Sequence, residues 1–209
     1  GIVMISPSAT NPKLTEQGFR NVFRVVKRDS EQARLAGDYL AEQWADARIA
    51  ILHDGTVYGQ DLAEETKRQL NRHGVKLTQF GEIVPGQPEY TEVVAVLEAA
   101  GIEVLFYGGY TAEAALIARH AHDRDYDLQL LGGDNLNGEY FLRVAGPAAE
   151  GVRFVSMADA RTHEAAAPVV ARFRAEGYEP EGFTLYGYAV VQVWAQAVEK
   201  AGAFDAAAV

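Results

Sequence analysis

The chain has 209 residues, enough to bury one good hydrophobic core or two small ones. Apolar residues make up 48% and charged residues 23% of the chain, values typical of a soluble globular protein rather than a disordered one. The net charge of −10 argues against nucleic-acid binding, because phosphate contacts need clustered Lys and Arg. The absence of cysteine excludes disulfides, thiolate catalysis and cysteine-based metal sites.

The first part of the chain contains two short apolar runs separated by a polar loop. Residues 2–5 and residues 21–26 are each predicted to form a strand, and residues 6–12 form the loop between them. Ser30 is a candidate N-cap for a helix that reaches Trp44. The start at Gly1, without an initiator Met or a basic leader, leads us to expect a fragment of a longer chain, with any signal peptide outside it.

The middle of the chain alternates strands and helices. Strands are predicted at residues 49–52, 75–83, 104–107 and 129–131, and helices at 58–70, 90–100 and 112–122, the last with Thr111 as its N-cap. Short, almost continuously apolar strands alternating with helices indicate a parallel sheet that is covered on both faces. Such sheets bind ligands at the carboxyl ends of their strands.

The last part of the chain is expected to contain a strand at residues 151–155, an irregular stretch at 157–163 and helices at 165–176 and 184–201. We place crossings between lobes near residues 26–30 and 155–162. The resulting fold class is α/β, with two Rossmann-like lobes whose parallel sheets are flanked by helices. Residues 29–156 form a complete lobe two, while residues 1–28 and 157–209 form a truncated lobe one.

Four candidate binding elements directly follow predicted strands. They are the Ser8-Ala9-Thr10 loop, Tyr58-Gly59 after Asp54, Gly108-Gly109-Tyr110, and Asp134. The loop hydroxyls and free amides suit a carboxylate, Asp134 suits a cation, and the tyrosines offer two rings, a combination that fits an α-amino acid. Each element alone is weak evidence for a binding site, because Ser and Thr in loops commonly form turns and a Tyr after a strand commonly packs in the core.

These segments resemble a known family. Residues 5–15, Asn21-Val-Phe-Arg24, Tyr58-Gly59, Phe106-Tyr-Gly-Gly-Tyr110 and Gly151 are similar to the leucine/isoleucine/valine-binding proteins of ABC importers, which are type I periplasmic binding proteins. The resemblance implies that Ser8, Ala9 and Thr10 hold the ligand carboxylate and that Tyr58 and Tyr110 wall the site. It also implies that Asp134 pairs with the ligand ammonium and that Phe183 lines the pocket for the ligand side chain.

The resemblance further implies a monomeric, extracytoplasmic protein, in the periplasm or at the cell surface. Such a protein captures an amino acid, branched-chain or similar, for an ABC permease in the membrane, without a cofactor, nucleic acid or enzymatic activity. Branched-chain binders usually have Glu at the position of Asp134, which favours an amino acid in general over a branched-chain one. The same fold also serves as a cytoplasmic ligand sensor or regulator domain, which stays the alternative function.

Enzymatic and metal sites are weakly indicated. His53-Asp54 follows a strand and Ser8 lies in a loop, but there is no Gly-x-Ser-x-Gly nucleophile elbow. His120 and His122 are two residues apart on a predicted helix, so they point to different faces and favour a solvated helix end over a metal site. The glycine pairs lack the spacing of phosphate-binding or dinucleotide-binding loops.

Overall fold

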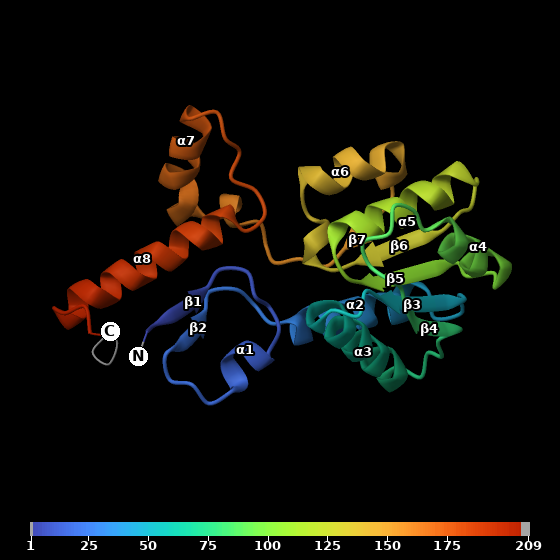
Figure 1. The fold of residues 1–209 in the computed structure, drawn as a ribbon, viewed down its shortest axis with the longest axis horizontal. Coiled ribbons are helices and arrows are strands. Elements are labelled where there is room, and N and C mark those ends of the chain that lie inside the picture. Colours follow the sequence, from blue (N-terminus) through green and yellow to red (C-terminus); the bar gives the residue numbers. More distant parts are fainter. Residues whose placement is uncertain (1, 206–209) are drawn as a thin grey trace. The chain divides into compact units, whose positions relative to one another are not determined.

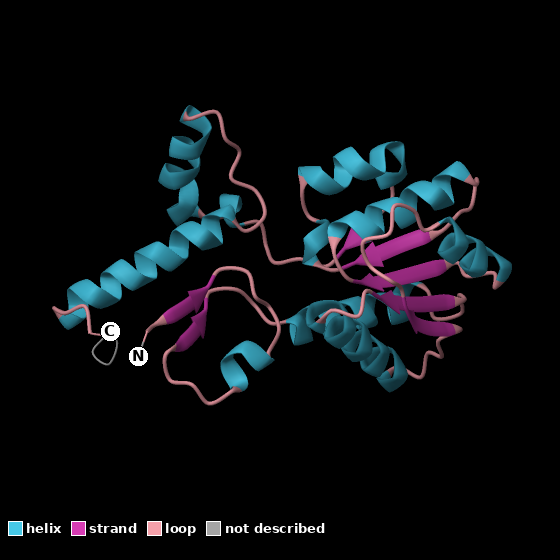
Figure 2. Cartoon of the chain, in the orientation of Figure 1, coloured by secondary structure: helices cyan, strands magenta, loops and turns pink. Residues whose placement is uncertain are grey.

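The computed structural model describes residues 2–205, and these residues divide into two compact units. One unit combines the stretch up to Arg28 with the stretch from Met157 onward, and the other is the continuous segment Asp29–Ser156. We call them the discontinuous unit and the continuous unit. Figure 1 traces both along the sequence, and Figure 2 shows their helices and strands.

The continuous unit is a three-layer α/β structure. Its strands are β3 (Ile49–His53), β4 (Gln79–Glu82), β5 (Val104–Gly108), β6 (Gln129–Gly132) and β7 (Arg153–Phe154). Its α-helices are α2 (Asp29–Gln43), α3 (Val57–Arg72), α4 (Thr91–Ala99), α5 (Thr111–Asp123) and α6 (Glu139–Ala145), with short 3₁₀ turns η1 (Asp134–Leu136) and η2 (Gly146–Ala149). Strands and helices therefore alternate along most of this segment, as the sequence predicts.

All pairs in this sheet are parallel, in the order β4-β3-β5-β6-β7. β4 lies on one side of β3, while β5, the next strand along the chain, lies on the other side. The connections therefore turn in opposite directions at β3 and β5, and the carboxyl ends of these two strands form a topological switch point. In open parallel sheets this point is where ligands bind.

The two faces of the sheet bury different sets of side chains because side chains alternate along each strand. Ala50 and Leu52 face a core built with α4, α5 and α6, whereas Ile49 and Ile51 face a core built with α2 and α3. Figure 1 shows these two groups of helices on opposite faces of the sheet. All five residues of β3 are buried, which explains its continuously apolar sequence.

Several predicted boundaries were wrong. β4 covers only the second half of the predicted strand 75–83, and α6 was not predicted. Thr111 is the first residue of α5, and the N-cap is Tyr110. The Thr111 hydroxyl does not cap the helix, because it donates to the carbonyl of Asn135 at 2.6 Å. Ser30 likewise lies inside α2, which begins at Asp29.

The discontinuous unit has a two-stranded parallel sheet in its first stretch of sequence and two longer helices in its second. β1 (Met4–Ser6) pairs with β2 (Val22–Arg24), and α1 (Lys13–Glu16) lies between them in the sequence. The later stretch contains η3 (Ala160–Thr162), η4 (Glu164–Ala166), α7 (Ala167–Ala175) and α8 (Thr184–Ala201), and α8 contacts β1. No helix in the described part of the chain has the length and apolar character needed to cross a membrane.

Each unit contains one of the two tryptophans of the chain. In the continuous unit, Trp44 contacts the ring of Tyr39 edge-on at 5.3 Å, and the Arg153 guanidinium lies 5.2 Å from its ring centre. In the discontinuous unit, Trp194 is 41% exposed and contacts the ring of Phe204 at 5.9 Å. The two indoles therefore lie in different surroundings.

Candidate functional site

Three of the predicted site residues gather at the carboxyl edge of the continuous unit's sheet. Tyr58 lies in the first turn of α3, which follows β3, while Tyr110 follows β5 and Asp134 follows β6. The Tyr58 and Tyr110 rings are 5.4 Å apart and tilted by 38°, and the Tyr58 hydroxyl donates to Asp134 Oδ1 at 3.0 Å. Side chains 76 positions apart therefore form one contiguous cluster at the switch point.

Asp134 is a buried carboxylate with one satisfied and one unsatisfied oxygen. The residue is 4% exposed, and within residues 2–205 its Oδ2 has no hydrogen-bond partner. Burial raises the pKa of the Asp134 carboxyl, while the hydrogen bond from the Tyr58 hydroxyl acts in the opposite direction. The Oδ2 atom of Asp134 is the point in the cluster at which a positively charged donor would be stabilised.

The Tyr58 hydroxyl stays protonated at neutral pH. Burial is the largest cause that raises the pKa of Tyr58, followed by the negative charges of Asp134 and Asp29. Tyr58 is therefore a hydrogen-bond donor to Asp134. Burial also raises the pKa of Tyr110, a residue that is 48% exposed. Tyr110 therefore presents a neutral aromatic surface.

Glycines in the two tyrosine motifs allow the tyrosines to come together. A Cβ at Gly59 would lie 2.5 Å from the Gly108 carbonyl oxygen, and one at Gly108 would overlap the Gly59 carbonyl oxygen. A Cβ at Gly109 would lie 2.5 Å from the Tyr107 hydroxyl and 2.8 Å from Asp54 Oδ2. None of these glycines has a positive φ, so the requirement is space. The start of α3 can therefore pack directly against the end of β5.

Asp54 has a structural role in this arrangement. Its Oδ1 accepts from the amide of Thr56 at 3.0 Å and the hydroxyl of Thr56 at 2.6 Å, and its Oδ2 accepts from the amide of Tyr110 at 3.2 Å. The carboxylate therefore joins the turn after β3 to the turn after β5. The neighbouring His53 is the last residue of β3, and its Nδ1 accepts from the amide of Gly55.

Gln32 belongs to the cluster, although no pattern in the sequence singles it out. It lies on the buried face of α2, and its Oε1 accepts from the Asp134 amide at 3.0 Å. Its Nε2 donates to Asp29 Oδ1 at 3.0 Å. A buried Gln in the first turn of a helix resembles an ordinary core position in sequence, because its partner is 102 positions away.

The Ser8-Ala9-Thr10 loop of the discontinuous unit closely follows β1. Ser8 and Ala9 are exposed, whereas Thr10 is 4% exposed. The hydroxyl oxygen of Ser6 accepts from the amide of Ala9 at 2.9 Å, which turns the chain as it leaves the strand. The amides of Ser8 and Ala9 are therefore directed at Ser6, and the buried Thr10 supplies a hydroxyl next to them.

Arg24, on the neighbouring strand β2, holds this loop in place. Its guanidinium donates to the carbonyls of Ala9 at 3.0 Å and Pro12 at 3.1 Å, and to the hydroxyl of Thr15 at 2.9 Å. The fork of donors on one planar group suits this spread of acceptors. Arg24 and Ser6 are thus supporting residues that the sequence reasoning did not identify.

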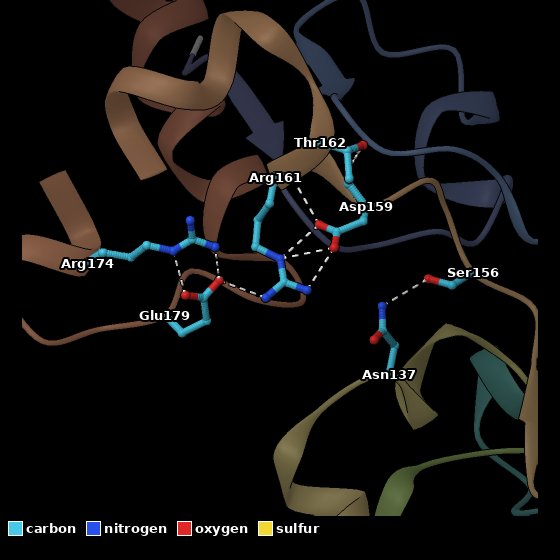
Figure 3. Close-up of polar contacts among 7 residues, drawn as sticks. All are labelled: Asn137, Ser156, Asp159, Arg161, Thr162, Arg174 and Glu179. Carbon is cyan, nitrogen blue, oxygen red and sulfur yellow. Dashed lines mark hydrogen bonds and ion pairs between the residues drawn. The ribbon is translucent and has the colours of Figure 1, made fainter. Parts of the chain in front are cut away.

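Phe183 lies in the other part of the discontinuous unit, immediately before α8. Its ring is partly buried and contacts the ring of Tyr186 at 6.2 Å. The loop that leads to it carries Glu179, which accepts from Arg161 Nη1 at 2.8 Å and Arg174 Nε at 2.8 Å. Figure 3 shows Arg161 between Asp159 and Glu179, so this ion network connects η3 and α7 to the loop before α8.

Comparisons with known proteins place these features in context. A family model described as "Periplasmic binding protein" matches residues 1–209. A "Leu/Ile/Val-binding protein homolog 1" from Brucella suis is 43% identical over 205 residues, which are 98% of this chain and 55% of the relative. The chain thus spans about half the length of this curated relative.

Solved structures share the fold. A leucine-binding protein from Thermotoga maritima superposes with a TM-score of 0.86 at 24% identity, over 99% of this chain and 59% of that chain. A branched-chain amino acid transporter substrate-binding protein from Streptococcus pneumoniae, in complex with isoleucine, gives a TM-score of 0.81 at 23% identity, again over 99% of this chain and 59% of that one.

Proposed function

Since the chain belongs to the periplasmic binding protein family, we propose that the protein is the extracytoplasmic substrate-binding component of an ABC importer and captures an α-amino acid. The observation that carries the proposal is the buried Asp134 Oδ2, which lacks a hydrogen-bond partner within residues 2–205. A buried acceptor without a donor costs about 1–3 kcal/mol, and a charged one more. A ligand ammonium would supply the missing donor and the opposite charge.

The surroundings of Asp134 support a cation with an apolar body. Tyr58 and Tyr110 present adjoining rings beside the carboxylate, and both keep their hydroxyl protons at neutral pH. Asp29 adds a second buried acidic side chain to the cluster. This side of the site therefore favours ammonium compounds over simple carboxylic acids.

The ligand carboxylate is assigned to the Ser8-Ala9-Thr10 loop, which Arg24 supports through its bonds to Ala9, Pro12 and Thr15. The hydroxyl of Thr10 is a suitable donor to a carboxylate. Phe183 is assigned to the pocket for the ligand side chain. In this proposal the two units are the two lobes, and the ligand binds between them as they close.

The proposed role is binding and delivery rather than catalysis. The closed, ligand-bound protein would be recognised by a membrane permease, and the protein acts as a monomer outside the cytoplasm. The Brucella suis relative carries the name of a Leu/Ile/Val-binding protein, so leucine is the first ligand to test.

The test compares leucine with 4-methylpentanoate, which is leucine without its ammonium group. Calorimetry on the intact protein should show that wild type binds leucine more tightly by about 10²–10³-fold, the range expected when one partner of a buried ion pair is missing. Asp134→Asn should remove most of this preference by weakening leucine binding specifically.

The matched control is Asp38→Asn. Asp38 lies on α2 of the same unit, where it pairs with His73 and Arg34 outside the cluster. This variant should bind leucine as wild type does, although it also loses one carboxylate. Undiminished leucine binding by Asp134→Asn would refute the assignment of Asp134 to the ammonium.

A further inference from the structure

We propose that Gln32 is a positioning residue that orients the Asp134 carboxylate for ammonium binding. This inference rests on the proposed function, because it assigns a role to another residue of the same site. It is carried by the hydrogen bonds that join α2 to the turn after β6.

Both polar atoms of the Gln32 side-chain amide form hydrogen bonds. The residue is 5% exposed, its Nε2 donates to Asp29 Oδ1 at 3.0 Å, and its Oε1 accepts from the Asp134 amide at 3.0 Å. A carboxylate at neutral pH only accepts hydrogen bonds, so Asp29 selects the amide orientation in which the oxygen points toward Asp134. Asp29 therefore fixes the orientation of the Gln32 side-chain amide, and Gln32 in turn fixes the position of the Asp134 backbone.

The backbone bond determines where the carboxylate points. Asp134 is the first residue of η1 and directly follows Gly133, which has no side chain to hold this part of the backbone in place. Gln32 fixes the main chain of Asp134, and the Tyr58 hydroxyl fixes its Oδ1. With these two points held, the direction of Oδ2 is determined before any ligand arrives, which reduces the ordering cost of binding.

Gln32 also acts on the charge of Asp134. The groups that face this cluster are Gln32 and Asp29 from α2, Tyr58 from α3, and Tyr110 from the turn after β5. Burial raises the pKa of Asp134, and the hydrogen bond from the Tyr58 hydroxyl to its Oδ1 counteracts part of that effect. Gln32 holds the Asp134 main chain where Oδ1 accepts this bond, so removing Gln32 should raise this pKa further, and Asp134 should lose its charge at a higher pH.

The test is Gln32→Met, which keeps the length of the side chain but removes both polar ends. Calorimetry with leucine from pH 4 to pH 8 should show affinity lower by about tenfold at pH 8, the effect of losing one hydrogen bond. The acid-side loss of affinity should also begin at a higher pH than in wild type.

Gln69→Met is the matched control. Gln69 is 9% exposed on α3, and its Nε2 donates to Asp38 Oδ1 on α2 at 2.6 Å. It is thus a second buried Gln that bonds an Asp of α2, away from the cluster. This variant should lower the urea midpoint of unfolding while its pH profile of leucine binding stays that of wild type. A Gln32→Met pH profile equal to that of Gln69→Met would overturn the proposal.

A ligand-free measurement separates this inference from the proposed function. NMR titration of the Asp134 carboxyl carbon in the unliganded protein should give a higher midpoint in Gln32→Met than in wild type. If wild type fails to bind leucine while this midpoint rises, the proposed function fails and the coupling of Gln32 to Asp134 stands. An unchanged midpoint refutes the coupling whatever the protein binds.

Discussion

Replacing Gly133 by alanine tests whether the cluster depends on the close approach of Tyr58 to Asp134. An alanine Cβ would overlap the Tyr58 hydroxyl and lie 2.9 Å from Leu62 Cδ2. Gly133 has a φ of −87° and a ψ of −170°, a backbone conformation that alanine readily adopts. The cost of Gly133→Ala is therefore steric, and it falls mainly on the hydroxyl that donates to Asp134.

The expected loss of stability in Gly133→Ala has two parts. Overpacking a buried site costs about 1–3 kcal/mol. If the hydroxyl is displaced, the hydrogen bond to the Asp134 carboxylate is lost as well, which costs about 1.5–3 kcal/mol because its acceptor is charged. We expect Gly133→Ala to lower the free energy of unfolding by about 2.5–6 kcal/mol when both parts apply.

A double-mutant cycle with Tyr58→Phe isolates the role of the hydroxyl. In the Tyr58→Phe background the overlapping oxygen is gone, and only the contact with Leu62 opposes the new methyl group. Urea unfolding should then give an alanine cost that is smaller by at least about 1 kcal/mol, within the range of coupling between residues in contact. Equal costs in the two backgrounds would refute the reasoning.

Gly81→Ala is the control for the change of residue type itself. Gly81 lies in β4, and a Cβ there would meet only Leu52 Cδ2 at 3.5 Å, an ordinary contact. Alanine at a compatible position stabilises by about 0.4–1 kcal/mol, because it restricts the unfolded chain. Gly81→Ala should therefore leave the protein as stable as wild type or slightly more so.

Two further predictions concern Arg24 and Asp134. Arg24→Met should weaken leucine binding by the intact protein by about tenfold, because the loop at Ala9 loses its guanidinium support; unchanged affinity in calorimetry would contradict this. Asp134→Asn should raise the free energy of unfolding at pH 7, where the buried carboxylate of wild type is costly, but not at pH 3. Because burial raises the folded-state pKa, wild type loses stability as pH rises from the unfolded-state value of about 3.9. Urea midpoints at both pH values check this, and a less stable variant at pH 7 would contradict it.

Much of the fold follows from local patterns. Buried parallel strands are short apolar runs, so β3 and β5 stand out in the sequence, and α8 begins and ends where its apolar spacing predicts. α6 was missed because its seven residues are too few to show a clear period. Thr111 was assigned as a cap because Thr is common there, whereas its hydroxyl bonds a carbonyl 24 residues later.

The candidate site also combines residues that the sequence indicates with residues that only the folded structure reveals. Tyr58, Tyr110 and Asp134 were selected because they directly follow strands, and the structure brings these three together. Gln32 follows no strand, and only the packing of α2 against the sheet brings it to Asp134. The assignment of Ser8, Ala9, Thr10 and Phe183 to the same ligand stays a prediction that the binding experiments address.

The placement of the two tryptophans gives each unit its own optical reporter. Trp44→Phe would leave the partly exposed Trp194 to report on the discontinuous unit, and Trp194→Phe would leave Trp44, packed beside Tyr39 and Arg153, to report on the continuous one. Intrinsic fluorescence of the two single-tryptophan proteins would then follow the two units separately during unfolding. Coincident transitions would mean that the units unfold as one cooperative system, and separate transitions would give each unit its own stability.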